Sequence, residues 1–321
     1  MAMLGKYRTT TELSNKDAGS CKWCFGIRDG EEYFIKEFIR PKYPTEDSVS
    51  SPERIRKKKA DCEVFEQKMA RIYRSVNEQS DGNAVRIMEF FRIGAKYYMA
   101  MPKIKSVSMD IAQISELAEP LKRKLCTVIA HALSGLHGVS FVHSDIKHSN
   151  VIFTYSSSNM LTAKLIDYDA GFFEDTPPAR AEEVAGDGNY FSPEAWIAMS
   201  GGEINLTCKL DIFALGVLFH EYYTGQLPDF DRTRYSCAGE ARADGGAVEV
   251  SWDMPMDIRR LLVRMLDADP AKRPDAQEVF TKLRGIHEMP DPAPEPDPDP
   301  KPIIFVPDPP GRPGWHKPTL D

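Results

Sequence analysis

The chain has 321 residues, enough for two domains of ordinary size or for two lobes around a cleft. Hydrophobic residues make up 42% and charged residues 28% of it, values near the globular average that exclude general disorder. The 41 basic and 48 acidic residues give a net charge of −7, and without a long basic block we expect no nucleic-acid partner.

The first hundred residues predict strands and one helix. Apolar runs at 24–28 and 31–38 flank an Asp-Gly pair at 29–30, which is typical of a two-residue hairpin. A second pair of runs, 85–92 and 96–101, is separated by a short turn. These patterns predict a β-rich N-terminal region.

The six cysteines do not form a disulfide scaffold in a chain of this length. Cys21 and Cys24 make one C-x-x-C pair, but no second Cys or His pair follows at the spacing of a zinc site. Three-residue spacing also places the two on opposite faces of a strand. We expect ordinary thiols.

One helix is expected between the two hairpins. Ser51 and Pro52 are typical of a helix N-cap and a first-turn proline. Apolar residues then recur at spacings of seven, three and four, which predicts one buried stripe. The stripe consists of Ile55, Cys62, Phe65, Met69, Ile72 and Val76.

From residue 110 onward the pattern is helical. An apolar stripe over 121–136 ends near Gly138. The run 210–219 is apolar on all sides, which predicts a helix buried at the centre of a lobe. A last helix is expected over 257–266, before the helix-breaking Asp-Pro pair at 269–270.

These patterns predict an α+β protein with two lobes. A small β-rich lobe with one helix covers 1–102, and a larger helical lobe covers 103–286. Residues 287–321 form a Pro/Asp-rich tail with half of the 24 prolines, and we expect it to be disordered. Docking of a partner on the tail is the alternative, because the apolar island 303–306 and Trp315 interrupt it.

The sequence contains no signal for a membrane. Its longest apolar run, 212–219, is too short to span a bilayer, and no cleavable signal precedes Gly5. We therefore expect a cytoplasmic protein without a membrane partner.

One polar segment carries the residues of greatest chemical interest. Residues 143–150 are His-Ser-Asp-Ile-Lys-His-Ser-Asn, and Asp167 follows Asn150 by seventeen residues. Phosphoryl transfer needs metal ions on the phosphate oxygens, a carboxylate to orient the attacking hydroxyl and a cation on the nucleotide. Asp145, Asn150 and Asp167 could supply the first two. Asp and Asn residues that merely mark turns are the alternative.

In these segments the chain resembles the eukaryotic-type protein kinase superfamily. Residues 143–150 are similar to its H-R-D catalytic loop, and Asp167 is similar to the aspartate of its D-F-G metal motif. The resemblance extends in order over roughly 7–283 and implies a bilobal protein-kinase-like fold with ATP and Mg²⁺ as cofactors. It makes Asp145 the catalytic carboxylate and makes Asn150 and Asp167 the metal ligands.

The resemblance also assigns a phosphate-binding lysine. Lys36, in Tyr-Phe-Ile-Lys, is similar to the lysine of the V-A-I-K strand that meets the α- and β-phosphates. Its carboxylate partner on the helix is Glu63 or Glu66. Glu66 is preferred because it lies within the apolar stripe.

The remaining nucleotide contacts follow in the same way. Met101 resembles the gatekeeper residue, and Lys103 and Ile104 resemble the segment that contacts adenine. The phosphate loop departs from the family, because only Gly19 stands where the family has G-x-G-x-x-G.

Residues that identify the fold occur in the second half. The Ser-Pro-Glu segment at 192–194 resembles the family's A-P-E, whose glutamate pairs with an arginine that Arg273 resembles. Asp211 and Gly216 resemble the buried-helix motif D-x-x-x-x-G, in which the aspartate braces the backbone of the catalytic loop.

Two further departures concern regulation. Asp169 replaces the glycine of D-F-G and would either add a metal contact or cap the turn. Ser144 replaces the catalytic-loop arginine that normally meets a phosphate on the activation loop, and Thr176 is the only hydroxyl over 171–186. We therefore expect activation without phosphorylation of this loop.

A compensating pair is expected near the catalytic carboxylate. Asp187 occupies the position of a family threonine that contacts the catalytic aspartate and the nearby lysine. We expect Asp187 to pair with Lys147, which would lie between it and the transferred phosphoryl group. A carboxylate so close to Asp145 should raise a pKa in the site.

The function most consistent with these residues is transfer of the γ-phosphoryl group of Mg-ATP to Ser or Thr hydroxyls of proteins. A lysine two residues after Asp145 resembles the Ser/Thr-specific kinases. A nucleotide-binding pseudokinase scaffold is the first alternative, because the glycine loop and the D-F-G motif are altered. A small-molecule kinase of the aminoglycoside or choline type is the second, because those enzymes share H-x-D-x-x-x-x-N.

Overall fold

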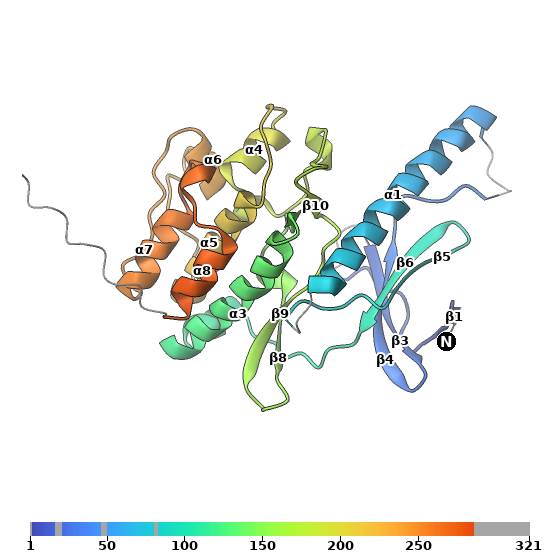
Figure 1. The fold of residues 1–321 in the computed structure, drawn as a ribbon, viewed down its shortest axis with the longest axis horizontal. Coiled ribbons are helices and arrows are strands. Elements are labelled where there is room, and N and C mark those ends of the chain that lie inside the picture. Colours follow the sequence, from blue (N-terminus) through green and yellow to red (C-terminus); the bar gives the residue numbers. More distant parts are fainter. Residues whose placement is uncertain (1, 17–20, 46–49, 80–82, 286–321) are drawn as a thin grey trace, which may run out of the picture. The chain divides into compact units, whose positions relative to one another are not determined.

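Six strands form an antiparallel sheet in the N-terminal part of the chain, as the computed structural model shows (Figure 1). The structure describes residues 2–16, 21–45, 50–79 and 83–285. The strand order is β1-β2-β3-β4-β6-β5. The strands are β1 (Met3–Leu4), β2 (Tyr7–Thr9), β3 (Cys21–Arg28), β4 (Glu31–Phe38), β5 (Glu89–Ile93) and β6 (Lys96–Pro102).

The hairpin predicted around residues 29–30 is confirmed. β3 pairs with β4 along its whole length, and Arg28 and Glu31 are the last pair before the turn. Asp29 and Gly30 have φ angles of 54° and 85°. Both lie in the left-handed region that a tight Asp-Gly turn between twisted strands requires.

Strand β5 is shorter than predicted and begins at Glu89, not at residue 85. Two backbone N–H groups ahead of it bond outside the sheet. The N–H of Val85 donates to the carbonyl oxygen of Leu165 at 3.2 Å, and that of Ile87 donates to Oδ1 of Asn77 at 2.8 Å. These long-range partners cannot be recognised from apolar periodicity.

The predicted helix is present as α1 (Pro52–Gln79), which lies beside the sheet (Figure 1). The N–H of Arg54 contacts Oγ of Ser51 at 3.4 Å, as expected for an N-cap. Phe65 packs edge-on against Phe38 of β4 and Tyr97 of β6. The buried stripe consists of Cys62, Met69, Ile72, Tyr73 and Val76.

Side-chain alternation along β4 separates two apolar clusters. Ile35 lies in the smaller cluster, with Cys24 and Tyr98 from the neighbouring strands. Phe38 lies in the main core together with side chains of α1. Lys36 shares that face, and its Nζ lies 5.9 Å from the centre of the Phe38 ring.

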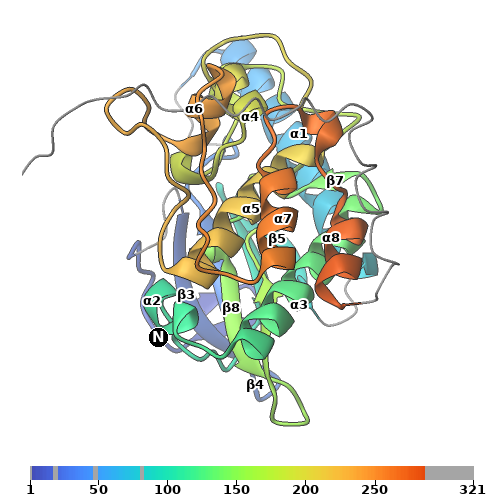
Figure 2. The same cartoon turned by 90° about the vertical axis from the view of Figure 1, so that its left-hand side faces the viewer.

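The rest of the described chain is mainly helical (Figures 1 and 2). Short strands pair as β7 with β10 and as β8 with β9. The α-helices are α2 (Ile111–Ser115), α3 (Glu119–His137), α4 (Pro193–Met199), α5 (Lys209–Thr224), α6 (Ala238–Ala243), α7 (Met256–Met265) and α8 (Ala276–Leu283). The strands and 3₁₀ helices are β7 (Phe141–Val142), η1 (His148–Asn150), β8 (Val151–Tyr155), β9 (Leu161–Leu165), β10 (Phe172–Phe173), η2 (Ala181–Glu183), η3 (Gly188–Tyr190) and η4 (Pro270–Lys272).

Helix α5 is buried on all sides, as its apolar sequence predicts. Every residue from Leu210 to Tyr223 is buried, and α2, α3, α4 and α7 pack around the helix (Figure 2). Helix α3 ends where Gly138 was expected to end it. Helix α5 is therefore the centre around which the other helices pack.

The prediction that the helix over 257–266 is the last one is wrong. α8 follows it and packs its buried Val279 and Leu283 against α3. Asp275 caps α8 by accepting the N–H of Glu278 at 2.7 Å. With only eight residues, α8 has too few apolar positions to show a clear helical period, and the Asp275–Glu278 spacing was its one local signal.

Three expectations concern the chain as a whole. The six cysteines form no disulfide bond with one another. Within the described residues, no helix is both long and apolar enough to cross a membrane. The tail predicted over 287–321 lies outside the described residues, and the lobe boundary at residue 102 remains a prediction.

A buried ion pair joins the start of α4 to the loop before α8. Nη1 and Nη2 of Arg273 donate to Oε1 and Oε2 of Glu194 at 2.6 and 2.9 Å. Both side chains are almost completely excluded from solvent. A bidentate pair in this environment satisfies both charges but makes each residue costly to lose alone.

We predict that Arg273→Ala lowers the free energy of unfolding by about 3–5 kcal/mol, because Glu194 would remain buried without a counter-ion. Urea unfolding followed by circular dichroism measures the change. Lys272→Ala is the control, because its ion pair with Asp269 is exposed and 3.9 Å long, and it should cost at most about 1 kcal/mol. Equal losses in the two variants would contradict the prediction.

Candidate active site

The β8–β9 hairpin holds two predicted site residues at one end. Val151 and Leu165 are its last pair on that side. Asn150 immediately precedes β8, and Asp167 lies two residues after β9. The N–H of Ile166 donates to the carbonyl oxygen of Asn150 at 3.0 Å, which continues the pairing up to the site. The interval between Asn150 and Asp167 is therefore the length of this hairpin.

The buried carboxylate of Asp211 in α5 fixes the backbone of the loop after β7. Its Oδ2 accepts the N–H of His143 at 2.7 Å, and its Oδ1 accepts the N–H of Ser144 at 2.8 Å. Nε2 of His137 lies 3.0 Å from Oδ2. Ser144 has a φ of 67°, a left-handed conformation that is unfavourable for a serine and that these hydrogen bonds maintain. Asp211 braces the loop, as expected.

Asp145 is held by two neighbours through one of its oxygens. Nδ2 of Asn150 donates to Oδ2 of Asp145 at 2.8 Å, and Nζ of Lys147 lies 2.9 Å from the same atom. Oδ1 of Asp145 is buried and has no hydrogen-bond partner within the described part of the chain. Because an unsatisfied buried acceptor is costly, Oδ1 indicates a position where a donor from a substrate would bind.

The structure corrects the predicted pair between Asp187 and Lys147. Lys147 contacts Asp145, and Asp187 accepts the N–H of Asn189 at 3.1 Å. This local bond caps η3, so the backbone satisfies the carboxylate that was expected to meet the lysine. Asp187 and Asp145 do line one small cavity, of about 10 Å³, with Tyr190.

Lys36 lies between two carboxylates. Its Nζ donates to Oδ1 of Asp167 at 2.8 Å and lies 2.6 Å from Oδ2 of Asp169. The second contact is an ion pair without hydrogen-bond alignment. Burial alone would lower the pKa of Lys36, but the charges of Asp169 and Asp167 outweigh it and raise that pKa. The amine therefore stays charged.

The structure corrects the predicted partner of this lysine. Glu66 accepts a hydrogen bond from the Tyr97 hydroxyl at 2.7 Å, and its Oε1 lies 3.8 Å from Nε of Arg92. Glu66 thus lies against β5 and β6 and not beside Lys36. Glu63, the alternative, is exposed. The apolar stripe identified the correct face of α1 but not the group that reaches the lysine.

Asp167 suits a divalent metal ion. Its side chain is 38% exposed, and its φ of 64° is a left-handed conformation of the kind found at functional sites. Burial would raise the pKa of Asp167, but the Lys36 ammonium outweighs it and lowers that pKa, so the carboxylate stays ionised. This carboxylate and the amide oxygen of Asn150 are ligands of the hard type that Mg²⁺ prefers.

Two protein ligands fit an ion that takes its other oxygens from phosphate and water. Within the described ranges, no group of three or more His, Cys, Asp or Glu side chains could enclose a metal ion. The donor set at Asp167 and Asn150 therefore fits a metal that arrives with a nucleotide better than a permanent metal site.

The predicted gatekeeper and the residues predicted to contact adenine lie at and just after the end of β6. Met101 is buried in the main core, and Ile104 packs against that core. Nζ of Lys103 pairs with Glu32 at 2.9 Å. Gly19, the predicted phosphate-loop glycine, lies outside the described residues.

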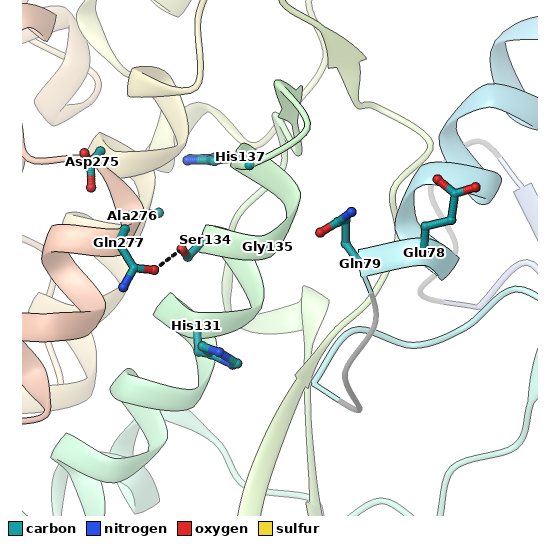
Figure 3. A pocket seen from close by; sticks show the side chains of 10 residues that line it. Glu78, Gln79, His131, Ser134, Gly135, His137, Asp275, Ala276 and Gln277 are labelled. Carbon is teal, nitrogen blue, oxygen red and sulfur yellow. Dashed lines mark hydrogen bonds between the residues drawn. The ribbon is translucent and has the colours of Figure 1, made fainter.

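A cavity of about 730 Å³ lies away from all of these residues (Figure 3). It is bounded by α3, the end of α1 and the start of α8. Its lining residues are Glu78, Gln79, His131, Ser134, Gly135, His137, Gly138, Asp275, Ala276 and Gln277. None of the predicted site residues is among them, and size alone does not make this cavity the active site. The titratable groups around Lys36 and Asp145 mark the candidate site.

Two contacts of the site were missed from the sequence. The hydroxyl of Tyr73 on α1 donates to Oδ1 of Asp169 at 2.7 Å. Oγ of Ser144 donates to the carbonyl oxygen of Ala185 at 3.0 Å. Tyr73 follows Met69 by four residues, so helical spacing places it on the buried face. Nothing in the local sequence connects it to Asp169.

Comparison with known proteins agrees with this geometry. A family model described as protein kinase domain matches residues 48–283. Protein kinase kin1 of Schizosaccharomyces pombe is 24% identical over 96% of this chain and 34% of its own length. Aurora kinase of the same yeast is 28% identical over 53% of this chain and 44% of its own. Serine/threonine-protein kinase PknH of Mycobacterium tuberculosis is 26% identical over 51% of this chain and 25% of its own.

The chain thus spans less than half the length of each of these relatives. The matched range includes Asp145, Asn150 and Asp167 but not Lys36. A protein kinase domain implies use of ATP, usually with a divalent metal. Because the family model covers most of the chain, we conclude that the chain belongs to the eukaryotic-type protein kinase superfamily.

Proposed function

We propose that the chain transfers the γ-phosphoryl group of Mg-ATP to Ser and Thr hydroxyls of proteins. The observation that carries this proposal is an unbroken series of contacts through the site. Lys36 contacts Asp167, the adjacent Ile166 bonds to Asn150, and Asn150 donates to Asp145. The groups suited to phosphate, metal and nucleophile are therefore neighbours.

In this proposal the site lies between two lobes. The six-stranded sheet and α1 form the smaller lobe, which supplies Lys36. The helical remainder forms the larger lobe, which supplies the loops at the end of the β8–β9 hairpin. The contact between Lys36 and Asp167 joins the two.

Asp145 acts on the acceptor hydroxyl. Its Oδ1 accepts the hydroxyl hydrogen and orients the oxygen for in-line attack on the γ-phosphorus. The new P–O bond forms as the bond to ADP breaks, and the proton passes to Asp145. Lys147 offsets negative charge on the transferred group, and Lys36 binds phosphate oxygens that do not react. A Mg²⁺ ion held by Asp167 and Asn150 would neutralise phosphate charge.

Two observations support Ser and Thr as acceptors. Lys147 lies two residues after Asp145, as in the Ser/Thr-specific members of the family. PknH, one of the relatives above, is named a serine/threonine-protein kinase. The identity of the protein substrate is a separate question, because the chain covers only part of each relative.

We also propose that the loop after β10 is set in place without phosphorylation. Ser144 bonds directly to the carbonyl oxygen of Ala185 in this loop. Gly186 follows with a φ of 151°, and a Cβ there would lie 2.7 Å from the carbonyl oxygen of Ser144. Arg71 on α1 pairs with Asp175 at 2.8 Å. The arginine that could otherwise bind a phosphate on this loop therefore already has a carboxylate partner.

We predict that Asp145→Asn lowers the rate of transfer by about 10²–10⁴-fold, because it removes the group that positions and accepts the proton. ATP affinity should stay within about two-fold, since Asp145 acts on the transition state and not on the nucleotide. Mass spectrometry after incubation with Mg-ATP and a mixed Ser, Thr and Tyr peptide pool measures transfer. Calorimetric titration with Mg-ATP measures affinity.

The control is Asp253→Asn, which makes the same chemical change at an exposed position outside the site. It should leave both measurements unchanged. Transfer to Tyr alone would contradict the acceptor assignment. Binding of ATP without any transfer would favour a pseudokinase scaffold, and transfer to aminoglycosides or choline but not to peptides would favour a small-molecule kinase.

Independence from loop phosphorylation has its own test. Thr176→Ala should leave turnover within about two-fold, because the exposed Thr176 hydroxyl contributes little beside the pair of Arg71 and Asp175. Peptide phosphorylation rates of the two proteins, each checked for its phosphate content, measure this. A large rise in turnover when Thr176 of the unsubstituted chain carries a phosphate would count against the proposal.

A further inference from the structure

The surroundings of Lys36 contain a carboxylate whose role the protein-kinase motifs do not assign. Asp169 lies 2.6 Å from Nζ of Lys36, closer than Asp167 at 2.8 Å. Its side chain is 18% exposed, so water screens this contact little. Glu66, the helix residue expected at this place, is bonded to Tyr97. Asp169 is thus the second counter-ion of Lys36.

Asp169 is itself held from α1. The Tyr73 hydroxyl donates to Oδ1 of Asp169, while Oδ2 faces Lys36, so the two oxygens have separate partners. Tyr73 is buried, and burial together with Asp169 raises the pKa of Tyr73 well above its ordinary value. Tyr73 therefore remains a hydrogen-bond donor. The contacts run from α1 through Tyr73 and Asp169 to Lys36 on β4.

We propose that Asp169 is the positioning residue for Lys36, and that Tyr73 links it to α1. The proposal rests on the function proposed above, in which Lys36 binds phosphate. It assigns to the aspartate after Tyr168 the task that the sequence suggested for a glutamate on α1. Asp169 acts through Lys36 and does not itself touch the nucleotide.

The charges explain why a second carboxylate is useful here. If Lys36 had only Asp167 as a partner, the ammonium would neutralise the carboxylate that is to hold a cation. With Asp169 present, one ammonium lies between two carboxylates, and the three groups carry a net charge of −1. Asp169 fixes the lysine, and Asp167 keeps attraction for a divalent ion.

A neighbouring contact holds the same two segments together. Arg71, two residues before Tyr73 on α1, pairs with Asp175 and lies 3.7 Å from the centre of the Phe173 ring. Helix α1 therefore contacts the segment that contains Asp169 at two points. The position of Asp169 relative to α1 is fixed by both.

A matched control set lies between β4 and β6. Oε1 of Glu37, next to Lys36 on β4, pairs with Nζ of Lys96 at 2.8 Å, and its Oε2 accepts the Tyr98 hydroxyl at 2.8 Å. This lysine–carboxylate–tyrosine set has the same chemistry as Lys36, Asp169 and Tyr73. It lies outside the candidate site.

The test is calorimetric titration of the full chain with Mg-ATP. Asp169→Asn should weaken binding about tenfold when Lys36 is present and less than about two-fold in a Lys36→Met background, because Asp169 acts through the lysine. Glu37→Gln, the control, should leave the affinity unchanged. Equal losses in both backgrounds would overturn the proposal. So would tighter binding by Asp169→Asn, the result expected if Asp169 merely repelled phosphate.

Tyr73→Phe is the second variant, which keeps the ring and removes only the hydroxyl. It should weaken Mg-ATP binding about three-fold, because Asp169 loses one of its two partners. Tyr98→Phe, the control, should lower the free energy of unfolding about as much as Tyr73→Phe does, but it should leave the affinity for Mg-ATP unchanged. Loss of stability without loss of affinity in Tyr73→Phe would show that Tyr73 is structural only, and would remove it from the proposal.

A measurement without nucleotide separates this proposal from the proposed function. Urea unfolding of Lys36→Met, Asp169→Asn and the double variant measures the stability that each change removes. The loss in the double variant should differ from the sum of the two single losses by about tenfold in the unfolding constant. If the unsubstituted chain bound no Mg-ATP, the proposed function would fail, but this cycle would still decide whether Asp169 holds Lys36. Additive losses would overturn that pairing.

Discussion

The buried carboxylate of Asp211 connects the polar site to the apolar centre of the molecule. α5 is buried along nearly its whole length, and a charge there is tolerated only because hydrogen bonds satisfy it. Asp211 receives them from the backbone of His143 and Ser144 and meets His137. The same bonds hold Ser144 in a left-handed conformation, so the direction of the chain toward Asp145 is set by the helix beneath it.

The proximity of Asn150 and Asp167 could be predicted from the sequence, because only one hairpin separates them. Asn150 and Asp167 flank β8 and β9, and pairing of those strands brings both to one end. The Asp-Gly turn and the buried α5 were predictable for the same reason, since their signals are local. Glu66 was different. Its distance from Lys36 depends on how α1 is rotated against the sheet, and Tyr97 and Arg92 determine that outcome.

The carboxylates illustrate why pairings across the fold escape local patterns. Lys36 had several acidic candidates, and spacing along α1 ranked only those on that helix. Asp169, more than a hundred residues later in the chain, was considered as a metal contact or a turn cap, yet it lies beside the lysine. The Lys147–Asp187 pair failed in a comparable way, because a backbone N–H of η3 satisfied Asp187 first. Local donors and tertiary packing decided both cases.

The two contacts of α1 with the segment after β9 differ in strength, and this bears on regulation. Arg71 and Asp175 are 46% and 65% exposed, so their ion pair contributes at most about 1 kcal/mol. Tyr73 is buried and the Asp169 side chain is only 18% exposed, and a hydrogen bond from a buried hydroxyl to a carboxylate contributes about 1.5–3 kcal/mol. The contact between Tyr73 and Asp169 therefore dominates. Because Asp169 also pairs with Lys36, a shift of α1 would disturb the lysine through Tyr73, without any glutamate on the helix.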